Sequence, residues 1–178
     1  MTIAKAELWK VGQVKPGDRI RFHPISADEA VALEKAQAHS VETLRSTHAP
    51  AFEVPSLAAS DIGSATLLAA LPATSTTPAA VYRQAGDKYV LIEYGDNVLD
   101  LALRLRVHLL MNALRERAVP GVAELAPGVR SLQVHYDGLI LSKKHLRNLL
   151  LELEAGLCDV SQLKVPSRIV WLPMAFED

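Results

Sequence analysis

The chain has 178 residues, of which 49% are hydrophobic and 22% are charged, and its formal net charge at pH 7 is −1. This composition is typical of a folded globular protein and excludes a disordered chain. The basic residues form no sustained run, so the sequence predicts neither nucleic-acid binding nor attachment to an anionic membrane. No apolar stretch reaches the roughly 18 residues of a membrane helix. The single cysteine, Cys158, excludes a disulfide framework and favours a reducing, cytoplasmic compartment.

The sequence pattern of residues 1–46 predicts a small appendage made of a strand and a helix. Pro16 and Gly17 form a turn signal, and Ile20 and Phe22 then alternate with polar residues, which is the pattern of a half-buried strand. Ser26 begins a capping box that predicts a helix running to about residue 45. Because so short a segment cannot bury a core of its own, we expect it to be the last piece of something larger.

Residues 47–78 are rich in proline, serine, threonine and alanine, which is the composition of a linker. Within this segment residues 64–71 predict a short helix whose leucines dock on a neighbour. We place a domain boundary here, because a linker of about 30 residues inside one compact domain would be unusual.

Residues 79–178 predict one compact unit that begins with strands at 81–84 and 89–94, joined by a Gly86-Asp87 turn. A helix is predicted from about 97 to 117, capped by Asp96 or Asn97, and Asp100 and Arg104 have the spacing of an ion pair. Its apolar stripe consists of Leu99, Leu103, Val107, Leu110 and Leu114.

The second half of this unit predicts strands at 122–125 and 130–136, then a helix capped by Ser142 and a last strand at 164–172. The leucines of that helix follow a helical period, and Pro166 favours an edge position for the last strand. The order is β-α-β-β-α-β, so we predict an α+β, ferredoxin-like sandwich preceded by one extra strand. Its helices cover one sheet face, and Ser131, Gln133 and His135 point to the other.

No complete catalytic or metal-binding motif is present, and no phosphate-binding glycine loop occurs. His135, near Arg130 and Ser131, has the chemistry to bind an anion or carry a proton, although a half-exposed packing role is the more ordinary interpretation. The arginines at 104, 106, 115 and 117 form a basic helix face that is usually only solvated. Trp171 and Phe176 predict a docking segment.

Several segments resemble one family. The front of the compact unit is similar to allophanate hydrolase subunit 1 domains, a group that includes the kinase inhibitor KipI and the B-type component of 5-oxoprolinase. The segments that carry this resemblance are YRQAGD at 82–87, VLIEYGD at 90–96, LDLA at 99–102, RVH at 106–108 and PGVRSLQVHYD at 127–137. VPSRIVWLP at 165–173 resembles the urea carboxylase branch, and WKVGQVKPGD at 9–18 with PIS at 24–26 is similar to the end of the subunit 2, or KipA-like, domain.

The resemblance implies a piece of the carboxyltransferase region of a biotin-dependent urea carboxylase, which moves a carboxyl group from carboxybiotin to urea and forms allophanate. It implies a subunit 2 remnant at 1–46, a linker at 47–78 and the first part of a subunit 1 domain at 79–178. Biotin on a separate carrier and ATP belong to the full enzyme, and we expect this chain to bind no cofactor or metal itself. The expected partners are the biotin carboxylase, the biotinyl carrier and the rest of the carboxyltransferase, and the chain alone is expected to be inactive.

Five residues are the candidates for contact with substrate, biotin or a partner: Arg130, Ser131, His135, Glu93 and Asn97. Arg130 can pair with a carboxylate and His135 can donate a hydrogen bond. Two other functions stay open. One is a non-catalytic interaction protein of the KipI type, and the other is a component similar to the B-type component of 5-oxoprolinase.

Overall fold

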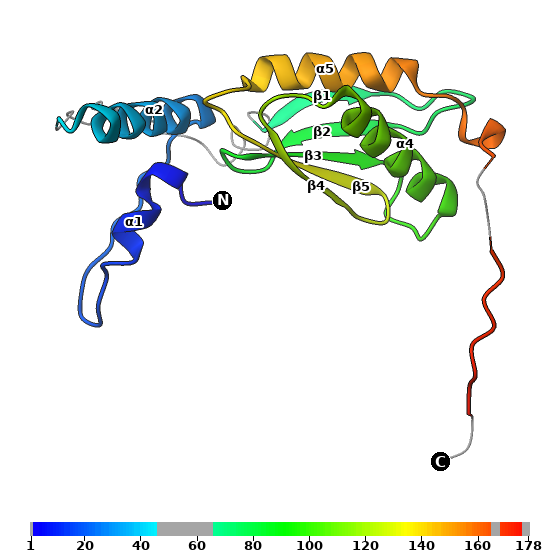
Figure 1. Cartoon of the computed structure of the whole chain (residues 1–178), viewed down its shortest axis with the longest axis horizontal. Helices are drawn as coiled ribbons and strands as arrows, with labels where there is room; N and C mark the ends of the chain where they lie inside the picture. Colours follow the sequence, from blue (N-terminus) through cyan, green and yellow to red (C-terminus); the bar gives the residue numbers. More distant parts are fainter. Residues whose placement is uncertain (1, 46–65, 165–167, 176–178) are drawn as a thin grey trace.

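The computed structural model describes residues 2–45, 66–164 and 168–175. Within these residues five strands form one sheet in which every neighbouring pair is antiparallel, in the order β1-β2-β3-β5-β4 (Figure 1). The strands are β1 (Leu67–Leu71), β2 (Ala80–Gln84), β3 (Tyr89–Tyr94), β4 (Val122–Pro127) and β5 (Ser131–Tyr136).

The alternation of side chains in β3 and β5 decides which face of the sheet is buried. In β5, Leu132, Val134 and Tyr136 are buried while the residues between them are half-exposed, as the two-residue period of a strand requires. β2 and β3 form the predicted hairpin, with Ala80 opposite Tyr94. Gly86 in its turn has φ +82°, a conformation that glycine adopts at no steric cost.

Helices α4 (Leu101–Arg117) and α5 (Lys143–Gly156) both pack on the same side of this sheet. Their buried residues join those of β2, β3 and β5 in one continuous hydrophobic core. Figure 1 shows α5 running along the top of the sheet, with α4 crossing in front of the strands. The expectation that the helices cover a single face is therefore confirmed, and the other face carries no helix among the described residues.

α4 begins later than the sequence predicted. Asp100 is its N-cap, because its carboxylate accepts a hydrogen bond of 2.7 Å from the backbone N–H of Ala102, so the prediction of Asp96 or Asn97 as the cap was wrong. As a result Leu99, 92% exposed, lies outside the helix, and the buried stripe starts at Leu103. The cap of α5 is Ser142, as predicted.

The predicted last strand at 164–172 is not formed by the described residues of that range. The described residues 168–175 form no strand, and Trp171 is 90% exposed; residues 165–167 and Phe176, to which part of the prediction applies, lie outside the described residues. β3 already has a neighbour on each side, β2 and β5, so no place beside it is left for a strand that follows α5. The structure has the order β3-α4-β4-β5-α5, and among the described residues after α5 the one further element is the short 3₁₀ turn η2 (Val160–Gln162).

The N-terminal residues form η1 (Lys5–Glu7), the single turn α1 (Leu8–Val11) and helix α2 (Ala27–Thr43). The predicted capping box is confirmed, since Ser26 and Glu29 exchange hydrogen bonds. The predicted strand around Ile20 and Phe22 was wrong: this stretch is irregular, and both side chains are exposed. An isolated extended segment has no neighbouring strand to satisfy its backbone groups.

The predicted helix at 64–71 was also wrong. Residues 67–71 are β1, which pairs with β2 through Leu71 and Ala80, while residues 64 and 65 lie outside the described part. Part of the predicted linker thus belongs to the sheet. In the part of the chain that the structure describes, no helix is long and apolar enough to cross a membrane.

Candidate functional site

The sheet face turned away from α4 and α5 is here called the open face. It is lined by the alternate side chains of the strands that do not enter the core, with Leu91, Gln133 and His135 half-buried. The prediction that Ser131, Gln133 and His135 point away from the helices is confirmed by the burial of their neighbours Leu132 and Val134.

A cluster of charged side chains occupies one end of the open face. The Glu93 carboxylate lies between two arginines, 2.9 Å from Nη2 of Arg130 and 3.3 Å from Nε of Arg83. Arg130 also donates from Nε to Oδ1 of Asn97 at 3.3 Å. The cluster forms because the sheet register sets Glu93 opposite Ser131, and the turn after β3 brings Asn97 back towards Arg130. Four of the five predicted residues are therefore neighbours.

His135 lies at the other end of β5 and does not join this cluster. It is four positions from Ser131 in the sequence, which is about 13 Å along a strand. Its ring stacks on that of Tyr89, with the centroids 4.7 Å apart and the planes 22° from parallel. Together with Gln133, Glu124 and Ala126 they line a shallow cavity of about 230 Å³. The structure thus divides the predicted site into a charged end and an aromatic end.

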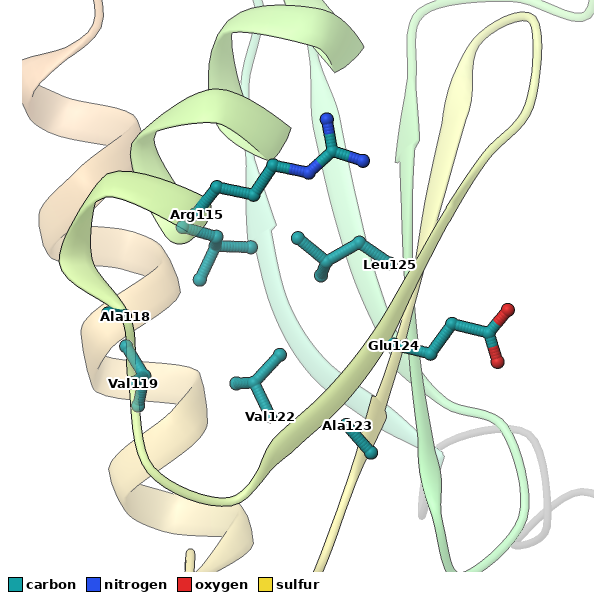
Figure 2. A pocket seen from close by; sticks show the side chains of 8 residues that line it. Arg115, Ala118, Val119, Val122, Ala123, Glu124 and Leu125 are labelled. Atoms are coloured by element: carbon teal, nitrogen blue, oxygen red, sulfur yellow. The ribbon is translucent and has the colours of Figure 1, made fainter.

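A second, larger cavity of about 490 Å³ lies between the end of α4 and β4. Figure 2 shows Leu125, Val122 and Val119 lining it, with Arg115 and Glu124 at its margin. Nothing in the sequence indicated this cavity, because it arises where the chain turns from α4 into the edge strand.

The core contains a charged network that the sequence did not predict. Arg106, expected on a solvated basic face, is only 1% exposed. It donates to Oε1 of Glu154 from Nε at 2.9 Å and from Nη2 at 2.6 Å, and to the carbonyl of Cys158 at 2.9 Å. The hydroxyl of Tyr94 donates to the other oxygen of Glu154.

This network has a clear effect on the tyrosines beside it. Burial, followed by the nearby charge of Glu154, raises the pKa of Tyr94 and of Tyr82 far above the usual value. The sequence did contain a signal for it. Arg106 stands in the stripe of Leu103 and Leu110, and Glu154 follows Leu150 by four residues, so opposite charges occupy core positions of two helices.

Within residues 2–45, 66–164 and 168–175, no group of three or more histidine, cysteine, aspartate or glutamate side chains is placed to hold a metal ion. The electrostatic features of the site are therefore its arginine and carboxylate pairs.

Comparison with known proteins agrees with the resemblance in the sequence. Residues 80–178 match the family described as carboxyltransferase domain, subdomain C and D. This chain belongs to that family.

The relatives extend the match to the N-terminal residues. The chain is 36% identical over 185 residues to the urea amidolyase of Saccharomyces cerevisiae and 38% identical over 186 residues to that of Lachancea kluyveri. Each alignment covers 99% of this chain and 10% of the relative, so the chain spans about a tenth of the length of these curated relatives.

Two solved structures give the same result. The K. lactis urea amidolyase superimposes with a TM-score of 0.74 at 33% identity, covering 86% of this chain and 9% of that one. The Kluyveromyces lactis urea carboxylase has a TM-score of 0.72 at 32% identity, covering 86% and 14%. The chain is homologous to the carboxyltransferase region of urea carboxylase.

Proposed function

We propose that this chain is a structural part of the carboxyltransferase region of a biotin-dependent urea carboxylase, in which a carboxyl group passes from carboxybiotin to urea and gives allophanate. The observation that supports the proposal is the similarity to the Saccharomyces cerevisiae urea amidolyase, which runs through 99% of the chain. Because the chain spans a tenth of that relative, turnover belongs to the assembled enzyme, with ATP and the biotinyl carrier supplied by other domains. Residues 1–46 are the proposed remnant of the subunit 2-like domain and residues 79–178 the proposed subunit 1-like part. Of the segment 47–78 between them, β1 joins the sheet of the second part.

The role of this chain within such an enzyme is to present its open face to the other domains of the carboxyltransferase. Half-buried side chains such as Leu91 and Gln133 leave apolar and hydrogen-bonding surface that a neighbouring domain can cover. The βαββα unit at β3-α4-β4-β5-α5 provides the rigid support, and in this proposal it corresponds to the first five elements of a ferredoxin-like arrangement.

The charged end of the open face does not by itself fit biotin. The guanidinium of Arg130 already binds Glu93, Asn97 and the carbonyl of Gly95, so an incoming carboxylate has to displace Glu93. The cluster is better suited to hold the turn at 95–97 in place than to receive a carboxyl group. Arg130, Ser131, Glu93, Asn97 and His135 are therefore proposed as contacts to a partner domain or as supports of a site that other domains complete.

Reconstitution tests the proposed function. The chain is added to the biotin carboxylase, the biotinyl carrier and the remaining carboxyltransferase domains, and urea-dependent loss of carboxybiotin is measured. We expect transfer to rise above the rate without the chain. If the rate stays at that of the control, the proposal is wrong.

A substitution in the complete enzyme tests the charged end. Arg130→Ala removes the group that ties Glu93 to Asn97, and we expect transfer to fall on the order of tenfold or more, since small displacements near a site are costly. Arg115→Ala, an exposed arginine at the end of α4, is the matched control and should leave the rate unchanged. Equal rates for Arg130→Ala and the parent would show that this cluster plays no part.

A non-catalytic interaction role is the second candidate, favoured by the 90% exposure of Trp171. In that case the chain would bind the other domains, and Trp171→Asp or His135→Asp would weaken binding, without any gain in transfer. A function like that of the B-type component of 5-oxoprolinase is less favoured, because the match to urea amidolyase includes the N-terminal residues.

A further inference from the structure

A buried ion pair joins helix α2 to the turn between β2 and β3. Lys88, in that turn, is 5% exposed, and Glu34, on α2, is 6% exposed. The ammonium of Lys88 donates to Oε2 of Glu34, while the ammonium of Lys5 lies 3.3 Å from Oε1 of the same carboxylate. Both charges of the central pair are thus removed from water and depend on each other.

Further polar contacts surround this pair at the same end of the sheet. The backbone N–H of Lys5 donates to Oδ2 of Asp87 at 2.9 Å, and Asp137, in the turn after β5, lies 3.6 Å from the ammonium of Lys88. At the margin Lys143 and Asp28 form a pair at 2.9 Å in which Asp28 is exposed. The N-terminal residues therefore contact both turns at one end of the sheet.

The backbone at these turns is shaped for close approach. A Cβ atom at Gly86 would lie 2.6 Å from the hydroxyl oxygen of Thr2, and one at Gly138 would lie 3.2 Å from a methyl group of Val31. Side chains at either position would hold the N-terminal residues away from the sheet. The contact is therefore a fitted surface, and its close approach depends on glycine in both turns.

The apolar core does not extend across this contact. The core cluster consists of residues of β2, β3, β5, α4, α5 and the loop before α5, whereas the buried Ala6 and Ala30 lie outside it. Hydrophobic burial, which stabilises the sheet and its two helices, contributes little to the attachment of residues 2–45. The ion pairs and the close packing at the two glycines therefore have to hold residues 2–45 in place.

We propose that the Lys88–Glu34 pair is a latch that holds residues 2–45 on the end of the sheet, and that breaking it releases α2 while the sheet stays folded. Removing Lys88 leaves the buried Glu34 carboxylate with the largely exposed Lys5 as its remaining ion-pair partner among the described residues, and the lost compensation penalises the docked arrangement and not the sheet itself. Once released, α2 has no core to pack on and, like other short helices, is marginally stable in water. The latch is independent of the proposed part in carboxyl transfer.

Hydrogen exchange on the full chain tests the latch. In Lys88→Met we expect the amide hydrogens of α2 to exchange at least about tenfold faster, while those of β3 and β5 change by less than about twofold. Lys144→Met, at an exposed position on α5, is the control and should change neither region. Lys143→Met should have a small effect on α2, because its partner Asp28 is exposed to solvent.

Two results would overturn the proposal. One is α2 exchange unchanged by Lys88→Met, and the other is an equal acceleration in α2, β3 and β5, which would mean that Lys88 only supports the sheet. The double variant Lys88→Met/Glu34→Met replaces the pair by apolar groups, so it should restore α2 protection to within about threefold of the parent. Failure of that rescue would show that Lys88 does not act through Glu34.

Discussion

The buried pair of Arg106 and Glu154 shows what one residue at a core position can do. Each residue lies among leucines on its own helix, and the two side chains form an ion pair. The hydroxyl of Tyr94 also donates to Glu154, and Arg106 also donates to the carbonyl of Cys158. Because the guanidinium also reaches the chain beyond α5, this network connects α4, α5 and β3. Removing one partner from such a buried charged network therefore lowers the stability of the fold.

Arg106→Met is therefore expected to lower the free energy of unfolding by about 3–5 kcal/mol, since it leaves Glu154 charged and buried. Chemical denaturation measures the change. Arg117→Met, which breaks an exposed pair with Glu152, is the matched control and should cost no more than about 1 kcal/mol. Similar losses in the two variants would contradict the proposed difference between buried and exposed pairs.

Asp137 gives the protein a defined response to acid. The backbone N–H of Leu139 donates to its carboxylate and, with a smaller effect from Lys88, holds its pKa below the usual 3.8. A lowered pKa means that the folded state gains stability when the carboxylate is charged, and that this gain disappears as the pH falls through the folded pKa.

In Asp137→Asn the amide oxygen can still accept from Leu139, but the charge is gone. We expect the free energy of unfolding of Asp137→Asn to be lower than that of the parent by less than about 1 kcal/mol above roughly pH 5. This difference should disappear as the pH falls below the lowered pKa of Asp137. Urea denaturation of both proteins across this pH range measures it. A difference that persists at the lowest pH would show that the effect does not come from the charge of Asp137.

At the scale of elements, local signals were sufficient where the pattern was strong. β3 was predicted because a run of β-favouring residues lies between two glycine-containing turns. The residues of β5 from 131 to 136 were predicted because apolar and polar side chains alternate, and Ser142 was identified because a serine precedes a leucine stripe. The errors in assigning strands have one cause. β1, the stretch around Ile20 and residues 168–172 depend on whether a distant strand is free to pair, and that information is not local.

The cap of α5 can be tested directly. The Ser142 hydroxyl accepts from the backbone N–H of His145 at 3.2 Å, so Ser142→Ala should lower the free energy of unfolding by about 1 kcal/mol. Thermal and chemical unfolding provide the measurement. Ser142→Asp keeps an acceptor at the helix start and should lose little, and an equal loss in both variants would argue against a capping role.

At the scale of the whole molecule, apolar surface gathers outside the main core. Leu8, Trp9 and Phe22 on the N-terminal side and Ile169 and Trp171 near the other end are all exposed, while the open face remains uncovered by the described residues. Figure 1 shows residues 168–175 extending away from the sheet and its helices. These surfaces suit the proposal that the chain works against neighbouring domains.

The high solvent exposure of Trp171 predicts how its fluorescence responds to a quencher. It is 90% exposed and Trp9 is 53% exposed, so acrylamide should quench Trp171 more efficiently. Trp171→Phe is expected to lower the quenching constant of the remaining fluorescence, and Trp9→Phe to raise it. The reverse order would mean that the segment around Trp171 packs on the chain in solution.

The sequence by itself determined most of the strands and helices of the compact unit, the single sheet face on which the helices lie, and the family. These features follow from alternation, helix caps and motif spacing, which depend on residues close together in the chain. It also brought Arg130, Glu93 and Asn97 together as candidates, although it did not separate them from His135. Only the tertiary structure decided that β1 extends the sheet beyond β2, that Arg106 is buried and that Lys88 pairs with Glu34 on α2. Each of these depends on contacts between residues far apart in the chain, where burial and pairing outweigh local preference.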